Sequence, residues 1–280
     1  MTTKTSLITD QIIKRLGEAG IKAKKSLGQN FLVNIGIYQK IIESAAIEPN
    51  DIVVEVGPGL GILTDMLADK AGKVIAIEKD SQLVRYLHEH FGNNKNVTII
   101  NEDILKFNPS NYELRDTSYK VVGNIPYYLT SRLIRDIFER WPRPKFIIFM
   151  LQKEVAQRIT ASPPDMSLLG VSVQYYSKPK IISYVSRGSF YPMPKVDSAI
   201  VRLVSSTKSQ ELKIKGTNFF SIVRAGFAGK RKQLANNLAR NLNLSKNIVE
   251  SKLLSLGIDP RRRAETLTIE EWQKITEILF

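Results

Sequence analysis

The sequence contains no cysteine among its 280 residues and only two histidines, His88 and His90. A chain without cysteine forms no disulfide and no thiolate metal site, and two histidines in one polar stretch make no metal-binding cluster. Long hydrophobic runs are also missing, since stretches such as 146–151 fall far below the roughly 20 residues that cross a bilayer. Residues 1–16 lack the apolar segment of a secretory signal. We therefore expect a cytoplasmic, membrane-free protein without a metal.

Acidic residues are scarce relative to basic ones. The chain has 27 acidic and 41 basic side chains, a net charge of +14 and a sequence pI near 9.8. Residues 207–280 contribute 14 basic and only 7 acidic side chains, so this last quarter carries half of the excess. A generally basic proteome would spread the charge evenly. The concentration instead favours a polyanionic partner, most simply a phosphate backbone.

The central part of the chain alternates short β-branched runs with helical stretches. The first run is DIVVEV at residue 51, and the last is KFIIFM at residue 145. Such alternation is typical of βαβ units and a parallel sheet. Two later runs, GVSVQYY at 170–176 and the segment 196–204, have no obvious helix between them and predict an antiparallel hairpin at one edge. The expected fold is α/β, with a mixed seven-stranded sheet.

A change of pattern near residue 206 predicts a domain boundary. The stretch 205–210, SSTKSQ, is polar, and the sequence after it is helical in pattern. Ser245 and Thr268 are expected helix N-caps, and Thr268 forms a capping box with Glu271. We therefore predict a Rossmann-like domain at residues 1–206 and a small α-helical domain at residues 207–280.

A glycine-rich turn, Gly57-Pro58-Gly59-Leu60-Gly61, follows the first β-branched run. Such a strand-to-helix turn lets a ligand approach the backbone and face a helix N-terminus, although many are only tight connections. Glu78 ends the next predicted strand 21 residues after Gly57. This is close to the spacing at which an acid binds the ribose hydroxyls of a nucleotide. The two features together predict a cofactor that contains a nucleoside.

The composition around the turn favours a cationic cofactor. Dinucleotide-binding turns need a glycine where this chain has Ile62, and Glu55 would repel a pyrophosphate. S-adenosylmethionine carries a sulfonium and no phosphate, so it suits these residues. Asp103, at the end of the third strand, could accept a hydrogen bond from the adenine amino group. The alternative is that Glu102 and Asp103 only cap a helix.

The fourth strand ends in Asn124-Ile125-Pro126-Tyr127, at the edge where open α/β sheets bind ligands. An exocyclic amine is a poor nucleophile because its lone pair is delocalised into the base. Two acceptors, the Asn124 side-chain oxygen and the Ile125 carbonyl, could bind its protons and favour the pyramidal form. Pro126 restricts the backbone around Ile125, and Tyr127 offers a ring for stacking. The alternative is an ordinary strand-ending turn with core aromatics.

A base inside a helix is out of reach, so a target adenine must be flipped out or already unstacked, and a second aromatic wall is expected. The candidate is Phe190, which precedes two prolines in the segment 189–198, SFYPMPKVDS. Lys195 in the same segment could contact phosphate. The alternative places Phe190 in the core and the prolines in a turn.

The chain resembles the ribosomal RNA adenine N6-dimethyltransferases, and specifically their bacterial small-subunit branch, which is tied to kasugamycin sensitivity. The resemblance extends over nearly the whole chain. It is carried by segments 25–32 (KSLGQNFL), 55–61, 124–127, 150–159 (MLQKEVAQRI), 190–198 and 257–268. It departs at 161–170 and 228–232.

The resemblance implies an S-adenosylmethionine-dependent enzyme that dimethylates two adjacent adenosines in a loop near the 3′ end of 16S rRNA, with a role in subunit biogenesis. It also implies cofactor contacts at six residues, namely Asn30, Leu32, Gly57, Glu78, Asp103 and Asn124. The alternatives are a 23S rRNA methyltransferase of the antibiotic-resistance type, a factor that mainly monitors ribosome assembly, and a methyltransferase acting on a protein amide. We expect a monomer.

Two basic runs in the C-terminal quarter are candidate RNA contacts. One consists of Lys230, Arg231 and Lys232, and the other of Arg261, Arg262 and Arg263. Charge runs are often only solvated surface. In a region with excess positive charge they predict phosphate contacts with the folded RNA of the small ribosomal subunit.

Overall fold

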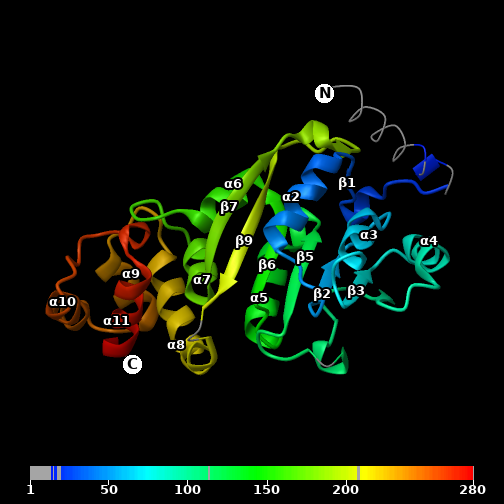
Figure 1. The fold of residues 1–280 in the computed structure, drawn as a ribbon. Coiled ribbons are helices and arrows are strands. Elements are labelled where there is room, and N and C mark those ends of the chain that lie inside the picture. Colours follow the sequence, from blue (N-terminus) through cyan, green and yellow to red (C-terminus); the bar gives the residue numbers. More distant parts are fainter. Residues whose placement is uncertain (1–13, 15, 18–19, 113, 207–208, 280) are drawn as a thin grey trace. The chain divides into compact units, whose positions relative to one another are not determined.

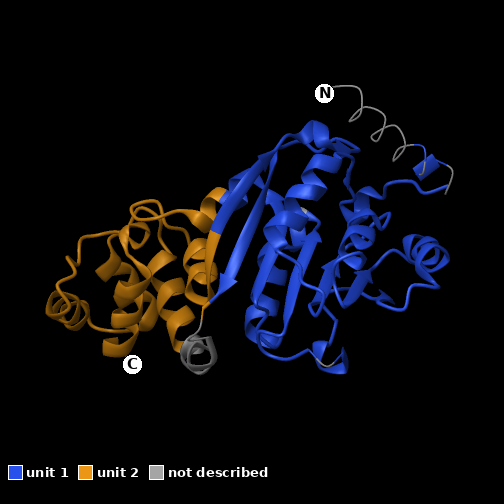
Figure 2. Cartoon of the chain, in the orientation of Figure 1, with its two compact units in different colours: residues 1–156, 180–205 blue, residues 157–179, 206–280 orange. Residues whose placement is uncertain are grey.

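The computed structural model describes residues 14, 16–17, 20–112, 114–206 and 209–279. The chain forms two compact units, one of residues 1–156 and 180–205 and one of residues 157–179 and 206–280 (Figure 2). The first unit is α/β and the second is helical. The sequence-based division assigned 157–179 to the first part, whereas in the structure these residues group with the C-terminal helices.

Seven strands form one sheet in the order β4-β3-β2-β5-β6-β9-β7 (Figure 1). The strands β2 to β6 pair in parallel, and β9 pairs antiparallel with β6. The expected mixed seven-stranded α/β sheet is therefore confirmed. The bounds are β2 (Ile52–Val56), β3 (Lys73–Glu78), β4 (Val97–Asn101), β5 (Tyr119–Asn124), β6 (Phe146–Gln152), β7 (Ser177–Val185) and β9 (Ser198–Ser205).

The direction of strand addition reverses between β2 and β5. From β2 the chain adds β3 and β4 on one side and then β5 and β6 on the other. The connecting helices include α3 (Ile62–Ala68), α4 (Ser81–Phe91) and α5 (Thr130–Arg140). Loops that leave neighbouring strand ends in opposite directions open a crevice at the carboxyl edge, which is where such sheets bind ligands.

One face of the sheet is covered by α3 and by α2 (Ile35–Ala45). Side chains alternate along each strand, so every second residue of β2, β3, β5 and β6 points to this face. Val53, Val74, Val122 and Ile148 are fully buried there in one cluster with residues of both helices. This packing holds the strand ends that form the crevice in a fixed register.

The segment 170–176 is helical, so the predicted strand GVSVQYY is wrong. It lies in α7 (Leu168–Tyr176), and the edge strand β7 begins only at Ser177. Ser167 caps α7 by accepting a hydrogen bond from Gly170 N at 3.0 Å. Tyr175 stacks on Phe219 with 3.9 Å between ring centroids. Because α7 is buried on several sides, its apolar residues do not show a helical period, and alternation alone misleads.

The second unit contains α7 and the helices of the C-terminal part. These are α8 (Ser209–Phe227), α9 (Leu234–Leu242), α10 (Lys246–Ser255) and α11 (Ile269–Leu279), with the short η5 (Ala264–Thr266). The predicted capping box is confirmed, because Glu271 N donates to Thr268 Oγ1 at 3.2 Å and Thr268 N donates to Glu271 Oε2 at 2.8 Å. Among the described residues no helix has the length and apolar character needed to span a membrane.

Candidate active site

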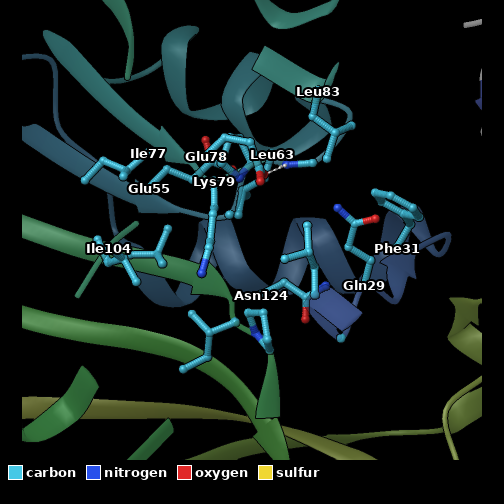
Figure 3. A pocket seen from close by; sticks show the side chains of 18 of the residues that line it. Gln29, Phe31, Glu55, Leu63, Ile77, Glu78, Lys79, Leu83, Ile104 and Asn124 are labelled. Atoms are coloured by element: carbon cyan, nitrogen blue, oxygen red, sulfur yellow. Dashed lines mark hydrogen bonds between the residues drawn. The ribbon is translucent and has the colours of Figure 1, made fainter. Parts of the chain in front are cut away.

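A cavity opens at the carboxyl ends of β2, β3 and β5, at the reversal point of the sheet (Figure 3). It holds about 1150 Å³ of empty space, its open mouth included. Small-molecule sites have this order of size. The side chains of Glu78 at the end of β3, of Ile104 after β4 and of Asn124 at the end of β5 surround the same space.

The glycine-rich turn forms the floor of this cavity. Gly57 and Gly59 have φ of +69° and +59°, in the left-handed region that favours glycine. A Cβ on Gly57 would lie 3.6 Å from the Asn124 carbonyl oxygen, and one on Gly59 would lie 3.4 Å from the Phe31 ring. The turn therefore brings the ends of β2 and β5 together and leaves bare backbone facing the cavity.

Two buried carboxyl groups line the cavity beside the turn. Glu78 Oε1 accepts a hydrogen bond from Asp80 N at 2.9 Å, and Glu78 Oε2 accepts one from Gly59 N at 3.4 Å. Burial raises the pKa of Glu78 above its usual value. Glu55 is 1% exposed and accepts a hydrogen bond from Thr64 Oγ1 at 2.6 Å. Burial raises the pKa of Glu55 to about 8. A cationic ligand would stabilise the ionised form of both carboxyl groups.

Asp103 lies at the cavity rim and stays ionised. Its Oδ2 forms an ion pair with Lys79 Nζ at 2.8 Å, and its Oδ1 accepts a hydrogen bond from Leu105 N at 3.1 Å. Partial burial alone would raise the pKa of Asp103, but the bonds from Lys79 and Leu105 outweigh it and hold this pKa below its usual value. Asp103 is thus a fixed anionic acceptor beside Ile104.

The Asn124 amide has a defined orientation. Its Nδ2 donates to the backbone carbonyl of Asn30 at 3.1 Å, which leaves Oδ1 as the end that can accept from a ligand. Among the described residues no hydrogen bond uses the carbonyl of Ile125, whereas the carbonyl of Pro126 accepts one from Leu129 N at 3.0 Å. Two acceptors from consecutive residues are therefore available at the end of β5.

The segment 24–33 forms an arm over the cavity, and its anchoring was not predicted. Lys24 Nζ and Gln29 Nε2 both donate to the Asp80 carboxylate, at 2.6 and 3.0 Å. Beyond them, β1 (Phe31–Leu32) pairs with β8 (Phe190–Tyr191). The only sequence signal was the KSLGQNFL resemblance, because no local pattern links Gln29 to Asp80, 51 residues away. The pairings hold Asn30 and Leu32 in the cavity wall.

Most predicted site residues come together in the cavity wall, but Phe190 does not. The wall contains Asn30, Leu32, Gly57, Glu78, Asp103, Asn124, Ile125 and Pro126. Phe190 is 4% exposed and packs in the core cluster opposite Leu32 of β1, so its ring has no free face for a base. The backbone of Tyr127 lies in η3 (Tyr127–Leu129), and its side chain is outside the described part.

Tyr128 is an exposed aromatic residue that the structure brings to the cavity. It is 61% exposed and lines the cavity next to Gly28 of the arm. A Cβ on Gly28 would meet the Tyr128 ring at 3.4 Å. Sequence reasoning passed over Tyr128 because it stands one residue beyond the Asn-Ile-Pro-Tyr motif.

The two basic runs of the second unit differ in their bonding. Arg262 makes a two-pronged ion pair with Glu271, at 2.5 and 3.1 Å, and also donates to Thr266. Arg261 pairs with Asp259 at 3.0 Å, and Arg263 lies 3.9 Å from Glu265. The prediction that Arg262 contacts RNA is therefore revised, because its guanidinium is committed to the junction between η5 and α11.

The other run, at residues 230–232, lies in the turn before α9. All three side chains are exposed. Within the described ranges no acidic side chain lies within ion-pair distance of Lys230, Arg231 or Lys232. Their charge is available to a partner.

The sheet order, the glycine-rich turn and the acid after β3 define an α/β methyltransferase that uses S-adenosylmethionine. Residues 20–280 match the family model described as ribosomal RNA adenine dimethylase. The chain belongs to this ribosomal RNA adenine dimethylase family.

Its relatives include two bacterial proteins named ribosomal RNA small subunit methyltransferase A. The one from Dehalococcoides mccartyi (strain CBDB1) is 46% identical over 255 residues, which cover 91% of this chain and 88% of the relative. The one from Bacillus cytotoxicus is 40% identical over 271 residues, covering 93% of this chain and 92% of the relative.

Two solved structures share the fold over most of the chain. A dimethyladenosine transferase from Plasmodium falciparum superposes with a TM-score of 0.76 at 28% identity, covering 88% of this chain and 95% of that one. The 23S rRNA methyltransferase ErmE superposes with a TM-score of 0.72 at 29% identity, covering 89% of this chain and 99% of that one.

The residues present fit S-adenosylmethionine. Gly57 and Gly59 line the cavity without side chains, so a ligand can approach their backbone closely. The buried Glu55 and Glu78 would oppose a phosphate and favour a sulfonium and an ammonium group. When bound, this cofactor supplies an electrophilic methyl group.

The raised pKa of Glu55 predicts a pH-dependent contribution to stability. Because burial raises this pKa from 4.5 to about 8, the folded protein holds the proton more tightly than the unfolded chain. The stabilisation is complete below the unfolded pKa and is lost as the pH rises through the folded one. We expect Glu55→Gln to gain stability relative to wild type from about pH 5 to about pH 8, by at most roughly 1.4 kcal/mol per pH unit.

The measurement is the free energy of unfolding in urea at several pH values, without cofactor. Glu78 titrates in the same direction and is present in both proteins, so the difference reports Glu55 together with its charge interaction with Glu78. Parallel pH profiles for the two proteins would contradict the assignment.

Proposed function

We propose that this enzyme dimethylates N6 of two adjacent adenosines in the loop near the 3′ end of 16S rRNA, on the small ribosomal subunit. Support for the small-subunit substrate comes from the names of relatives at 40 and 46% identity, against 29% for the 23S enzyme. The proposed site of action is the cytoplasm, and the proposed active form is the monomer.

The observation that carries the chemistry is the fixed amide of Asn124. Because Nδ2 is held by the Asn30 carbonyl, Oδ1 can accept a hydrogen bond from one N6–H of the target adenine, and the Ile125 carbonyl can accept one from the other. Both bonds favour the pyramidal amine that reacts. Correct positioning of the amine and the methyl donor then supplies much of the rate enhancement, without a dedicated general base. Pro126 keeps the two acceptors in place.

The same surroundings suggest how the other site residues act. We assign cofactor binding to Asn30, Leu32, Gly57, Glu78, Asp103 and Asn124, with Glu78 on the ribose and Asp103 at the adenine. Tyr127 remains the proposed stacking ring for the target base. Phe190 is assigned a supporting part instead, because its buried ring packs beneath β1 and holds Leu32 in the wall.

The test of the substrate is mass spectrometry of nucleosides from undermethylated small subunits incubated with the enzyme and deuterated S-adenosylmethionine. Two forms of 23S RNA serve as controls, one free of protein and one within ribosomes. Labelled dimethyladenosine in 16S RNA is expected. Label only in 23S RNA would move the enzyme to the resistance type.

A role in monitoring subunit assembly is the second candidate, and it is favoured by the exposed cations at residues 230–232. Growth of a strain carrying Asn124→Ala is compared with that of a deletion strain. Equal defects mean that methylation is the function, and a milder defect of the variant means that docking matters by itself.

The contrast between the two basic runs predicts unequal effects on RNA affinity. Arg231→Ala is expected to weaken binding to small subunits and to reduce the slope of log affinity against log salt by about 0.7 to 0.9, the value of one lost phosphate contact. Arg261→Ala removes the same group where Asp259 already neutralises it, so a smaller effect is expected. A filter-binding titration at several salt concentrations measures both, and equal slopes would contradict the distinction.

A further inference from the structure

We propose that a basic and aromatic patch beside the cavity binds a nucleotide that neighbours the target adenosine on the same unpaired RNA strand. The patch consists of Lys153, Tyr184 and Arg187, and we call it the Tyr184 patch. The inference rests on the proposed function, because it names a second contact for the same RNA substrate.

The core of the patch is a lysine over an exposed ring. Lys153 Nζ lies 5.3 Å from the centroid of the Tyr184 ring, and Tyr184 is 52% exposed. A large exposed ring with a cation at its side is the combination with which proteins hold unpaired nucleotides, since the ring stacks on a base and the cation meets phosphate.

The patch lies at the edge of the sheet that holds the cavity. Lys153 directly follows β6, which runs parallel to β5, and Met150 of β6 is the register partner of Asn124. Lys153 comes three positions after Met150 in the chain, a distance on the order of 10 Å along an extended backbone. A nucleotide next to the flipped adenosine can therefore reach the patch.

Backbone contacts join the patch to the arm of the cavity. Lys153 N donates to the Asp197 carbonyl at 3.0 Å, and Arg187 N donates to Asp197 Oδ1 at 3.0 Å. From Arg187 the chain enters η4 (Arg187–Ser189), where the Ser189 carbonyl accepts a hydrogen bond from Val33 N at 2.8 Å. The patch and the arm are thus parts of one connected rim.

The charges of the patch are available to a ligand. Lys153 and Arg187 are exposed, and in the ranges that the structure describes neither of them forms an ion pair. Asp197 is the acid inside the rim, and its Oδ1 is bound to backbone. This differs from residues 261–263 of the second unit, whose arginines all have acidic partners.

Protection of a sheet edge is the alternative explanation for basic residues here. The strand β7 ends the sheet, and it carries Lys178 and Lys180, which guard against pairing with another sheet. That explanation covers lysines on the strand. It does not account for Lys153 on α6 (Lys153–Thr160), for Arg187 outside the strand, or for an exposed tyrosine.

The test uses steady-state methylation of undermethylated small subunits by Tyr184→Leu, Tyr184→Phe and Lys153→Ala. Tyr184→Leu is expected to raise KM for the subunit at least about fivefold, the loss of one stacked base, with kcat and cofactor affinity unchanged. Tyr184→Phe keeps the ring and is expected to behave as wild type. Lys153→Ala is expected to raise KM and to flatten its salt dependence.

Lys145→Ala is the matched control for Lys153→Ala. Lys145 is also exposed and directly precedes β6, so it lies at the opposite end of the same strand. Its loss removes the same charge without touching the rim, and no change in KM is expected. Equal effects of the two lysine variants, or an unchanged KM for Tyr184→Leu, would overturn the proposal.

Ultraviolet cross-linking of the wild-type complex identifies what covers the ring. A nucleotide adduct on the Tyr184 peptide is expected, and an adduct with a ribosomal protein would overturn the proposal in favour of protein docking. If wild type itself methylates no adenosine in small subunits, the proposed function fails. If wild type is active and the Tyr184 variants are unaffected, only the patch assignment fails.

Discussion

Replacing Asn124 by alanine is expected to lower kcat for methyl transfer by about 10²- to 10³-fold, the usual cost of losing one preorganised hydrogen-bonding group at a reacting centre. The loss follows from the orientation of its amide. With Nδ2 bound to the Asn30 carbonyl, Oδ1 is held ready to accept a hydrogen bond from the target amine. Water in its place would have to be ordered during the reaction.

Three measurements separate this effect from a loss of structure or binding. Single-turnover methylation gives the rate, calorimetry gives the cofactor affinity, and a binding titration gives the affinity for small subunits. Subunit affinity is expected to stay within about twofold, because one amide contributes little to an interface dominated by phosphate contacts. If Asn124→Ala methylates at the wild-type rate, the Asn-Ile-Pro-Tyr motif is only a strand-ending turn without a role in the chemistry.

The largest expected effect on the free energy of unfolding concerns a buried lysine outside the active-site cavity. Lys120, in β5, is 1% exposed, and its Nζ donates to the Ala46 carbonyl at 2.7 Å and pairs with Asp51. Lys120→Ala leaves the Asp51 carboxylate without its counter-charge and the Ala46 carbonyl without the hydrogen bond from Lys120. We expect it to lower the free energy of unfolding by about 3–5 kcal/mol, the usual cost of breaking a buried ion pair.

A double variant provides the matched control. Lys120→Met with Asp51→Asn removes both charges but keeps side-chain volume, and the new amide oxygen can still accept the bond that Glu48 N gives to Asp51. This variant is expected to lose far less stability, because an ion pair replaced as a unit leaves no unpaired charge. Urea denaturation without cofactor measures both proteins. Equal losses would mean that packing, and not the charge, explains the effect of Lys120→Ala.

The main architecture and much of the cavity follow from local sequence signals. The alternation after residue 51 predicted the parallel sheet, because a strand buried on both faces needs a continuous β-branched run. Gly57, Glu78 and Asp103 were predicted from their places after consecutive strands, since parallel strands bring their carboxyl ends to one edge. The capping box at Thr268 was also readable, because its two partners lie within one helical turn.

Other features depend on contacts between residues far apart in the chain. The segment 170–176 has the alternation of a strand, and only packing such as that of Tyr175 on Phe219 makes it a helix. Phe190 stands beside two prolines like a loop aromatic, but the pairing of β8 with β1 buries its ring. Neither outcome can be read from a local pattern, because the burial of a side chain is decided by its neighbours in space.

The sequence by itself determined the parallel sheet, the glycine-rich turn, the acids that follow the strands and the Asn-Ile-Pro-Tyr motif, all of which have short-range signatures. Only the tertiary structure decided which charges are free. Arg231 and Arg262 look alike in the sequence, yet in the described part of the chain Arg262 is paired with Glu271 and Arg231 has no such acid. The reason is physical: the field at a cation depends on which acids the fold brings within a few ångströms of it, and sequence spacing does not determine that distance.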